Sequence, residues 1–148
     1  MSSLQLRRRI LGIDLGRARI GVAVSDELGM LAHPVETIPA NADATKRIAE
    51  IVREKDAERV VVGLPRHMNG SVGIGATEAL EFAQKLRALL PCDVLTWDER
   101  LTTTAAHRAL RESGRKTRDS RRVVDQVAAQ MILQSYLDSL PGTGILQS

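Results

Sequence analysis

Three acidic positions stand where packing alone would not favour a charge. The first is Asp14, which lies near the end of the apolar segment Ile10–Leu15 and is followed two residues later by Gly16. A carboxylate withdrawn from water needs a cation or hydrogen-bond donors, because an uncompensated buried charge is costly. The structural alternative is an Asp that caps a turn, since Asp-x-Gly is a common turn pattern.

The second position is the pair Asp98 and Glu99, which follows a strand predicted over Val94–Asp98. Successive side chains of a strand point to opposite faces, so at most one of the pair faces a given site. Ligands of open α/β sheets gather beyond the carboxyl ends of the strands. The structural alternatives are that Asp98 caps a helix beginning near Thr102, or that Glu99 pairs with Arg100.

The third position is Asp125, in a helix predicted over Val123–Leu140. It lies on the side of the small residues Ala128 and Ala129 and of Ile132, whereas a polar stripe follows another face. That stripe consists of Gln126, Gln130 and Gln134. A carboxylate on the inward face needs a cation or donors, and a buried pair with an arginine is the alternative.

Acids from two strand ends and one helix face form a ligand set that suits hard divalent cations. Mg²⁺ and Mn²⁺ prefer oxygen ligands and use few protein carboxylates, with water and substrate phosphates completing the shell. Two such ions about 3.5–4 Å apart would activate water and stabilise the leaving oxygen of a phosphodiester. The histidines His33, His67 and His107 show no zinc-binding spacing, and we expect each on the surface or in a loop.

Positive charge is concentrated between residues 108 and 122, where only Glu112 and Asp119 oppose it. Such a cluster is typical of a phosphate-binding surface, and a solvated, mobile basic loop is the alternative. The pattern of the chain separately predicts a loop over 115–121. Its members are Arg108, Arg111, Arg115, Lys116, Arg118, Arg121 and Arg122.

A glycine-rich segment over 64–75 precedes a helix predicted over Thr77–Leu90. Open backbone N–H groups there, at Gly70, Gly73 and Gly75, together with the helix N-terminus, can receive a phosphate. The segment lacks the GK[ST] signature of a P-loop, which excludes a Walker nucleotide site. A plain connection is the alternative.

Length and composition indicate one soluble globular domain over 1–148, with a core over about 9–140 and a loose tail over 141–148. Aromatic residues make up 2% of the chain, which argues against binders that stack bases on aromatic rings. The lone Cys92 excludes an internal disulfide and suits a reducing cytoplasm. We see no signal peptide and no apolar run near the ~20 residues of a membrane helix.

The hydrophobic pattern predicts the order βββαβαβαα, an α/β fold with a five-stranded mixed sheet and helices on both faces. The strand carrying Asp14 should be central, with the last helix packed across it, and Pro34 favours an edge or a bulge. The helix over Thr77–Leu90 should direct Leu80, Ala83, Leu86 and Leu90 to the core. The other predicted strands are Ile20–Ser25, Leu31–Ile38 and Arg59–Gly63, and the other helices Ala44–Lys55 and Thr102–Ser113.

Four motifs, in order over roughly residues 10–137, are shared with a known family. They are Gly12–Gly16 with Arg19–Ala23, Val62–Pro65 with Met68–Gly70, Asp98–Thr103, and Val124–Asp125 with Ala128–Ala129 and Ile132–Leu133. The chain resembles the YqgF-like pre-16S ribosomal RNA processing nucleases, which are also described as Holliday-junction-resolvase-like proteins. It departs from their commonest pattern at Ala18 and His67, positions that would touch phosphate contacts.

The resemblance implies an RNase H-like fold with catalytic and metal-binding acids at Asp14, Glu99 and Asp125. Glu99 is favoured because the resolvase-like pattern places Glu second in Asp-Glu-Arg, and Asp98 stays the alternative ligand. The resemblance also implies substrate-binding residues within its motifs, at Arg19, Asn69 and Arg100. The clustering of positive charge just before the Asp125 helix separately predicts phosphate contacts, at Arg115, Lys116, Arg118, Arg121 and Arg122.

We therefore expect a cytoplasmic, Mg²⁺- or Mn²⁺-dependent nuclease that processes the 5′ end of precursor 16S ribosomal RNA, acting as a monomer or homodimer without a membrane partner. Precursor RNA or branched DNA, and ribosomal particles, are the expected partners. Alternatives are a Holliday junction resolvase, which would need a dimer, and a non-catalytic ribosome-assembly or RNA-binding factor. An actin-like ATPase or sugar kinase, suggested by Gly12–Gly16, is disfavoured because the chain lacks a second half to close over ATP.

Overall fold

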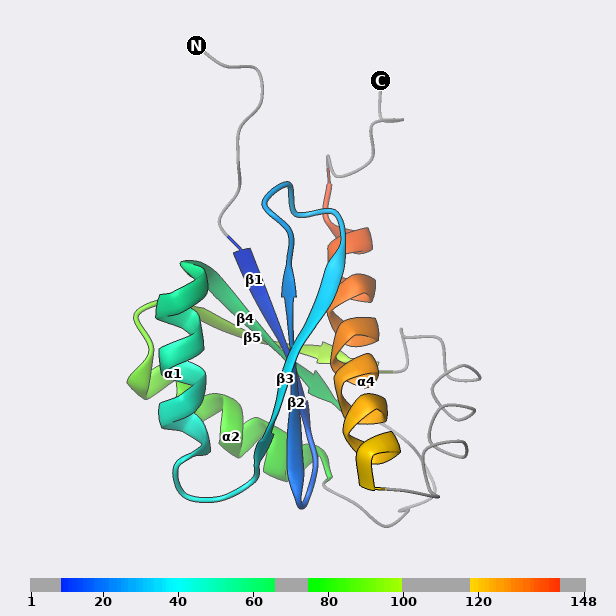
Figure 1. The fold of residues 1–148 in the computed structure, drawn as a ribbon. Helices are drawn as coiled ribbons and strands as arrows, with labels where there is room; N and C mark the ends of the chain where they lie inside the picture. Colours follow the sequence, from blue (N-terminus) through cyan, green and yellow to red (C-terminus); the bar gives the residue numbers. More distant parts are fainter. Residues whose placement is uncertain (1–8, 66–74, 100–117, 142–148) are drawn as a thin grey trace.

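The computed structural model describes residues 9–65, 75–99 and 118–141, with the backbone alone over 118–125. Five strands form one mixed sheet in the order β3-β2-β1-β4-β5 (Figure 1). The first three strands pair antiparallel, whereas β1, β4 and β5 run parallel. The strands are β1 Arg9–Leu15, β2 Arg19–Ser25, β3 Ala32–Pro39, β4 Ala57–Leu64 and β5 Asp93–Asp98. The predicted sheet, with the Asp14 strand at its centre, is confirmed.

Pro34 lies on the edge strand β3, where the sheet needs no hydrogen bond from its missing N–H. The pairing of β3 with β2 also shifts register there, from Val22 opposite Glu36 to Ala23 opposite Pro34. Both expectations for this proline, an edge and a bulge, are therefore met.

Helices cover the two faces of the sheet separately (Figure 1). One face carries α1, Ala44–Lys55, and α2, Ala76–Leu89, and the other carries α4, Arg118–Ser139. Side chains of β1 alternate between the two cores: Leu11 and Ile13 pack toward α1 and α2, and Ile10 packs toward α4. The predicted helix over Thr102–Ser113 lies outside the described residues.

Two details of the helices differ from expectation. Leu80 is 45% exposed, and Ala79 is buried in its place. The buried stripe of α2 runs through Ala79, Ala83 and Leu86, so the prediction was wrong by one position in the first turn. The last helix begins at Arg118, which corrects the predicted loop over 115–121 from that residue on. Arginine is a good helix former, and charge alone does not distinguish a basic loop from a basic helix.

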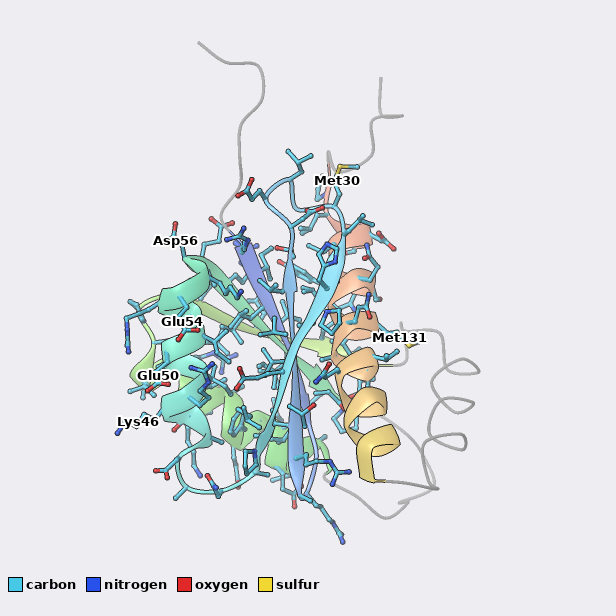
Figure 2. The ribbon with its side chains drawn as sticks, in the orientation of Figure 1. Met30, Lys46, Glu50, Glu54, Asp56 and Met131 are labelled. Carbon is cyan, nitrogen blue, oxygen red and sulfur yellow. The ribbon has the colours of Figure 1, made fainter. Side chains whose placement is uncertain are left out.

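Helix α1 is fastened to the edge strand by Arg47. Its guanidinium donates to both carboxylate oxygens of Glu36 on β3, at 2.8 and 2.9 Å, and also bonds Glu50 and Glu54 on its own helix. Glu50 and Glu54 line the outer side of α1 (Figure 2). The hydrogen bonds from Arg47 hold the pKa of the Glu36 carboxyl below its usual value.

Helix α4 approaches the sheet closely because small residues meet at the contact. A side chain at Gly12 would place its Cβ 2.6 Å from Cβ of Leu133 and 3.1 Å from the carbonyl oxygen of Ala129. Ala128 and Ala129 are themselves buried. The backbone of β1 therefore lies directly against α4, two residues before Asp14.

The predicted polar stripe of α4 binds the edge of the sheet. The Gln130 amide donates to the carbonyl of Ala32 at 2.9 Å, and the N–H of Ala32 donates to Gln134 Oε1 at 2.9 Å. Gln134 also donates to the carbonyl of Met30, which lies beside the C-terminal part of α4 (Figure 2). These bonds satisfy edge groups of β3 and fix α4 in register across the sheet.

Candidate active site

Three parallel strands bring their carboxyl ends to one edge of the sheet. Asp14 is the last residue but one of β1, Gly63 holds the same place in β4, and Asp98 ends β5. The register pairs Ile13 with Val62 and Gly63 with Trp97, so these strand ends lie side by side. The predicted gathering of acids at strand ends therefore has a structural basis.

The alternation of side chains places Asp14 on the face that carries α4. Gly12 lies against α4, whereas Ile13 belongs to the core under α1 and α2. A residue two positions from Gly12 in the same strand shares its face. Asp14, which is half-buried, therefore points to the α4 side of the sheet.

Glu99 lies on this same face. Its carboxylate covers Gly63: a Cβ built on Gly63 would be 2.8 Å from Oε2 of Glu99 and 2.6 Å from Cδ1 of Ile132 in α4. In β5 the preceding odd-numbered residue, Trp97, packs with the α4 core, whereas Val94 belongs to the opposite core. Alternate residues of a strand share a face, so Asp98 lies on the same face as Val94. Glu99 is therefore the member of the pair that shares a face with Asp14.

The end of β5 is fastened to α4 by polar and aromatic contacts. The indole N–H of Trp97 donates to Oγ of Ser135 at 3.0 Å, and the ring meets that of Tyr136 edge-on with centroids 5.4 Å apart. The Tyr136 hydroxyl in turn accepts from Arg59 of β4 at 2.8 Å. These contacts hold the strand two residues before Glu99.

Asp125 lies in α4, and its side chain is outside the described residues. Its backbone position is one helical turn before Ala129, which contacts β1 at Gly12, and two turns before Ile132, which lies at Gly63. Positions spaced by one and two turns share a helix face. Position 125 is therefore on the sheet-facing side of α4, in the half nearer the carboxyl end of β1 (Figure 1).

Within the residues whose side chains are described, no group of three His, Cys, Asp or Glu residues is close enough to hold a metal ion. Two of the three predicted acids, Asp14 and Glu99, do share one face of neighbouring strand ends. The third would have to come from position 125. The shared metal site therefore stays a prediction.

The predicted substrate-binding residues are only partly placed. Arg19 opens β2, and its carbonyl accepts the Gly16 N–H at 3.1 Å across the turn that follows Asp14. Arg118, Arg121 and Arg122 belong to the first two turns of α4, by backbone alone. Outside the described residues lie Asn69, Arg100, Arg115 and Lys116, and also Arg108, Arg111, His67, His107, Gly70 and Gly73.

The expectation of an open amide at Gly75 was wrong. Its N–H donates to Oε1 of Glu78 at 3.0 Å, so the first turn of α2 caps its own N-terminus with a carboxylate. A Glu three residues after the N-cap forms this contact in many helices. Sequence reasoning also did not single out Gly63 as a contact of Glu99, although a glycine within a strand often marks a close approach.

Known proteins match this chain over most of its length. Residues 8–139 match the family model described as "RuvX: Holliday junction resolvase". The chain belongs to the RuvX family. A relative from Nocardia farcinica named "Putative pre-16S rRNA nuclease" is 51% identical over 141 residues, covering 89% of this chain and 78% of its own. A relative of the same name from Bacillus thuringiensis is 44% identical over 135 residues, covering 88% and 98%.

Solved structures similar to this RuvX-family chain include Thermus thermophilus RuvC. The isolated RuvC has a TM-score of 0.56 at 14% identity, covering 91% of this chain and 97% of its own. RuvC in complex with a Holliday junction substrate has a TM-score of 0.54 at 16% identity, covering 89% and 96%. The predicted family, RNase H-like fold and nuclease class are confirmed. Among the described residues, no helix is long and apolar enough to cross a membrane.

Proposed function

We propose that this RuvX-family nuclease hydrolyses phosphodiester bonds of precursor 16S ribosomal RNA at its 5′ end, using Asp14, Glu99 and Asp125. The observation that carries the proposal is the Glu99 carboxylate seated over Gly63, on the face that Asp14 shares. Its relatives, named for action on pre-16S rRNA, support the choice of substrate. The protein would act in the cytoplasm as a single domain, as a monomer or homodimer.

The acids fit a hard divalent cation. All three offer carboxylate oxygens, the donors that Mg²⁺ and Mn²⁺ prefer, and Glu99 fills the space that a Cβ at Gly63 would take. Asp14, Glu99 and Asp125 would hold the ions, with Asp98 the less favoured ligand. Bound there, two Mg²⁺ or Mn²⁺ ions would supply an activated water and stabilise the leaving oxygen.

The chain itself would supply preorganisation. Asp14 lies on the central strand, paired on both sides by β2 and β4. Glu99 follows a strand whose end is fastened to α4 through Trp97. Acids on such rigid elements keep their geometry without reorganisation when the substrate arrives. Arg19, Asn69 and Arg100 would bind the substrate backbone next to them.

The basic residues at the start of α4 should bind phosphates. We expect Arg118→Ala/Arg121→Ala to flatten the dependence of log affinity on log salt by ~0.7–0.9 for each phosphate that the variant no longer neutralises. The measurement is RNA affinity at several salt concentrations, with Arg53→Ala on α1, across the sheet, as the matched control. An unchanged slope would show that the arginines, like the neighbouring Arg115, Lys116 and Arg122, form a solvated surface.

Two labelled substrates test the choice of nucleic acid. We expect the purified protein with Mn²⁺ to cut a precursor 16S ribosomal RNA 5′ end and to leave a four-way DNA junction intact. Paired cuts in the junction would favour the resolvase that the family model names, acting as a dimer. Binding of the RNA or of ribosomal particles without metal-dependent cleavage would favour a non-catalytic assembly factor.

A further inference from the structure

Gly63 is the point where three elements meet at the candidate site. It belongs to β4, between β1 with Asp14 and β5, which leads to Glu99. A Cβ at this position would lie 2.8 Å from Oε2 and 3.4 Å from Cδ of Glu99, and 2.6 Å from Cδ1 of Ile132. Real Cβ atoms essentially never lie within 3.0 Å of such a neighbour, so a Cβ at position 63 would force a shift at its two nearest contacts, Oε2 of Glu99 and Cδ1 of Ile132. Both atoms are the ends of side chains, so these side chains are the groups expected to move.

We propose that Gly63 is a positioning residue for the reaction: its missing side chain forms a seat, closed by Ile132, that holds the Glu99 carboxylate on the face shared with Asp14. The inference rests on the proposed function, because it assigns Gly63 a role through Glu99. Glu99 lies one residue beyond Asp98, the last residue of β5 that pairs with β4. The seat therefore restricts a side chain to which the backbone alone leaves several rotamers.

The two contacts at Gly63 have different consequences. Ile132 is fully buried, and its Cδ1 is the end of a side chain that packs in the α4 core. A clash with Ile132 would disturb packing, whereas a clash with Oε2 of Glu99 would move a metal ligand. Ile132→Val removes Cδ1 alone, so it relieves the packing clash and leaves the clash with Glu99 in place.

The test is a double-mutant cycle made in the Ile132→Val protein, with Mn²⁺ binding measured by calorimetry. Residues that orient metal ligands typically contribute 10–100-fold to metal affinity, so Gly63→Ala should raise the Mn²⁺ dissociation constant by about that factor. In a protein that already carries Glu99→Gln, Gly63→Ala should change the Mn²⁺ dissociation constant less than about twofold. A difference between the effects of Gly63→Ala with and without Glu99→Gln measures the coupling between the two residues. The melting temperature in EDTA should change little between the paired proteins.

A second variant avoids adding atoms near the seat. Glu99→Asp shortens the side chain by one methylene, so its carboxylate would not reach the position over Gly63. We expect this variant also to weaken Mn²⁺ binding about tenfold or more, with an unchanged melting temperature in EDTA. A metal-free crystal structure of Ile132→Val/Gly63→Ala should show the Glu99 carboxylate displaced from β4.

The outcomes separate this inference from the proposed function. If Glu99→Gln weakens Mn²⁺ binding but Gly63→Ala and Glu99→Asp do not, the positioning role is wrong and the metal site stands. If Gly63→Ala weakens binding equally with and without Glu99→Gln, its effect does not pass through Glu99, and the inference also fails. If Glu99→Gln leaves Mn²⁺ binding unchanged, Glu99 is not the metal ligand that the proposed function requires. The positioning role of Gly63 is then wrong as well.

Discussion

Glu99→Gln is expected to reduce kcat/KM for cleavage by more than about 100-fold, whereas Asp98→Asn should stay within a few-fold of the unaltered protein. Residues that only orient a metal ligand typically contribute 10–100-fold to metal affinity or activity, so removal of a ligand itself should reduce activity more. The two substitutions are a matched pair, because each replaces one carboxylate by its amide at adjacent positions. The measurement is single-turnover cleavage with Mn²⁺.

The two substitutions should differ because Glu99 and Asp98 lie on opposite faces of the sheet. Glu99 covers Gly63 next to α4, on the side shared with Asp14, whereas Asp98 follows the parity of Val94 toward the α1 and α2 core. An inactive Asp98→Asn beside an active Glu99→Gln would show that Asp98, and not Glu99, is the residue that the reaction needs. The assignment of Glu99 would then be wrong.

Mn²⁺ is expected to stabilise the protein against unfolding, and Asp14→Asn and Asp125→Asn should abolish this stabilisation. A ligand at 100 times its dissociation constant adds ~2.7 kcal/mol to the free energy of unfolding. For a chain of this size, each kcal/mol corresponds to a rise of roughly 2–4 °C in the melting temperature. The measurement is thermal unfolding with Mn²⁺ and with EDTA.

Unfolding in EDTA tests whether the carboxylates destabilise the protein when no metal is bound. Carboxylates gathered at one place repel each other, so removing one charge should leave Asp14→Asn as stable in EDTA as the unaltered protein, or slightly more stable. Asp98→Asn is the control and should keep the full Mn²⁺ stabilisation. If Asp14→Asn, Glu99→Gln and Asp125→Asn all keep it too, the shared metal site fails and a non-catalytic assembly factor becomes the better explanation.

Much of the fold could be predicted because the strands carry a strong periodic signal. The apolar segment Ile10–Leu15 predicted a strand, and the structure confirms it as β1, paired with β2. Pro34 predicted an edge strand because it lacks an N–H for the ladder. The helix Ala44–Lys55 was predicted to the residue, since its apolar positions recur every three or four residues.

The errors in the predicted fold occur at residues whose environment depends on tertiary contacts, which a local sequence pattern does not reveal. Leu80 fits an apolar stripe as well as Ala79 does, but the orientation of α2 on the sheet buries Ala79 and leaves Leu80 45% exposed. The glutamines of α4 look like a solvated stripe, yet Gln130 and Gln134 bind the backbone of β3, far away in sequence.

The candidate site was predicted by residue type more than by geometry. Strand alternation alone predicted that Asp98 and Glu99 face opposite ways, and the structure adds which of them faces α4. That choice depends on the packing of Trp97 against Tyr136 and on the empty position at Gly63. Both are contacts between elements distant in the sequence, so no local motif could reveal them.

The most direct test of the proposed function compares cleavage of a labelled precursor 16S ribosomal RNA 5′ end by the unaltered protein and by Asp14→Asn. Each protein is incubated with Mn²⁺ and, separately, with EDTA. We expect a defined cut by the unaltered protein with Mn²⁺ alone, and none with EDTA or by Asp14→Asn. Equal cleavage by both proteins, or cleavage that persists in EDTA, would contradict a metal-dependent nuclease built on these carboxylates.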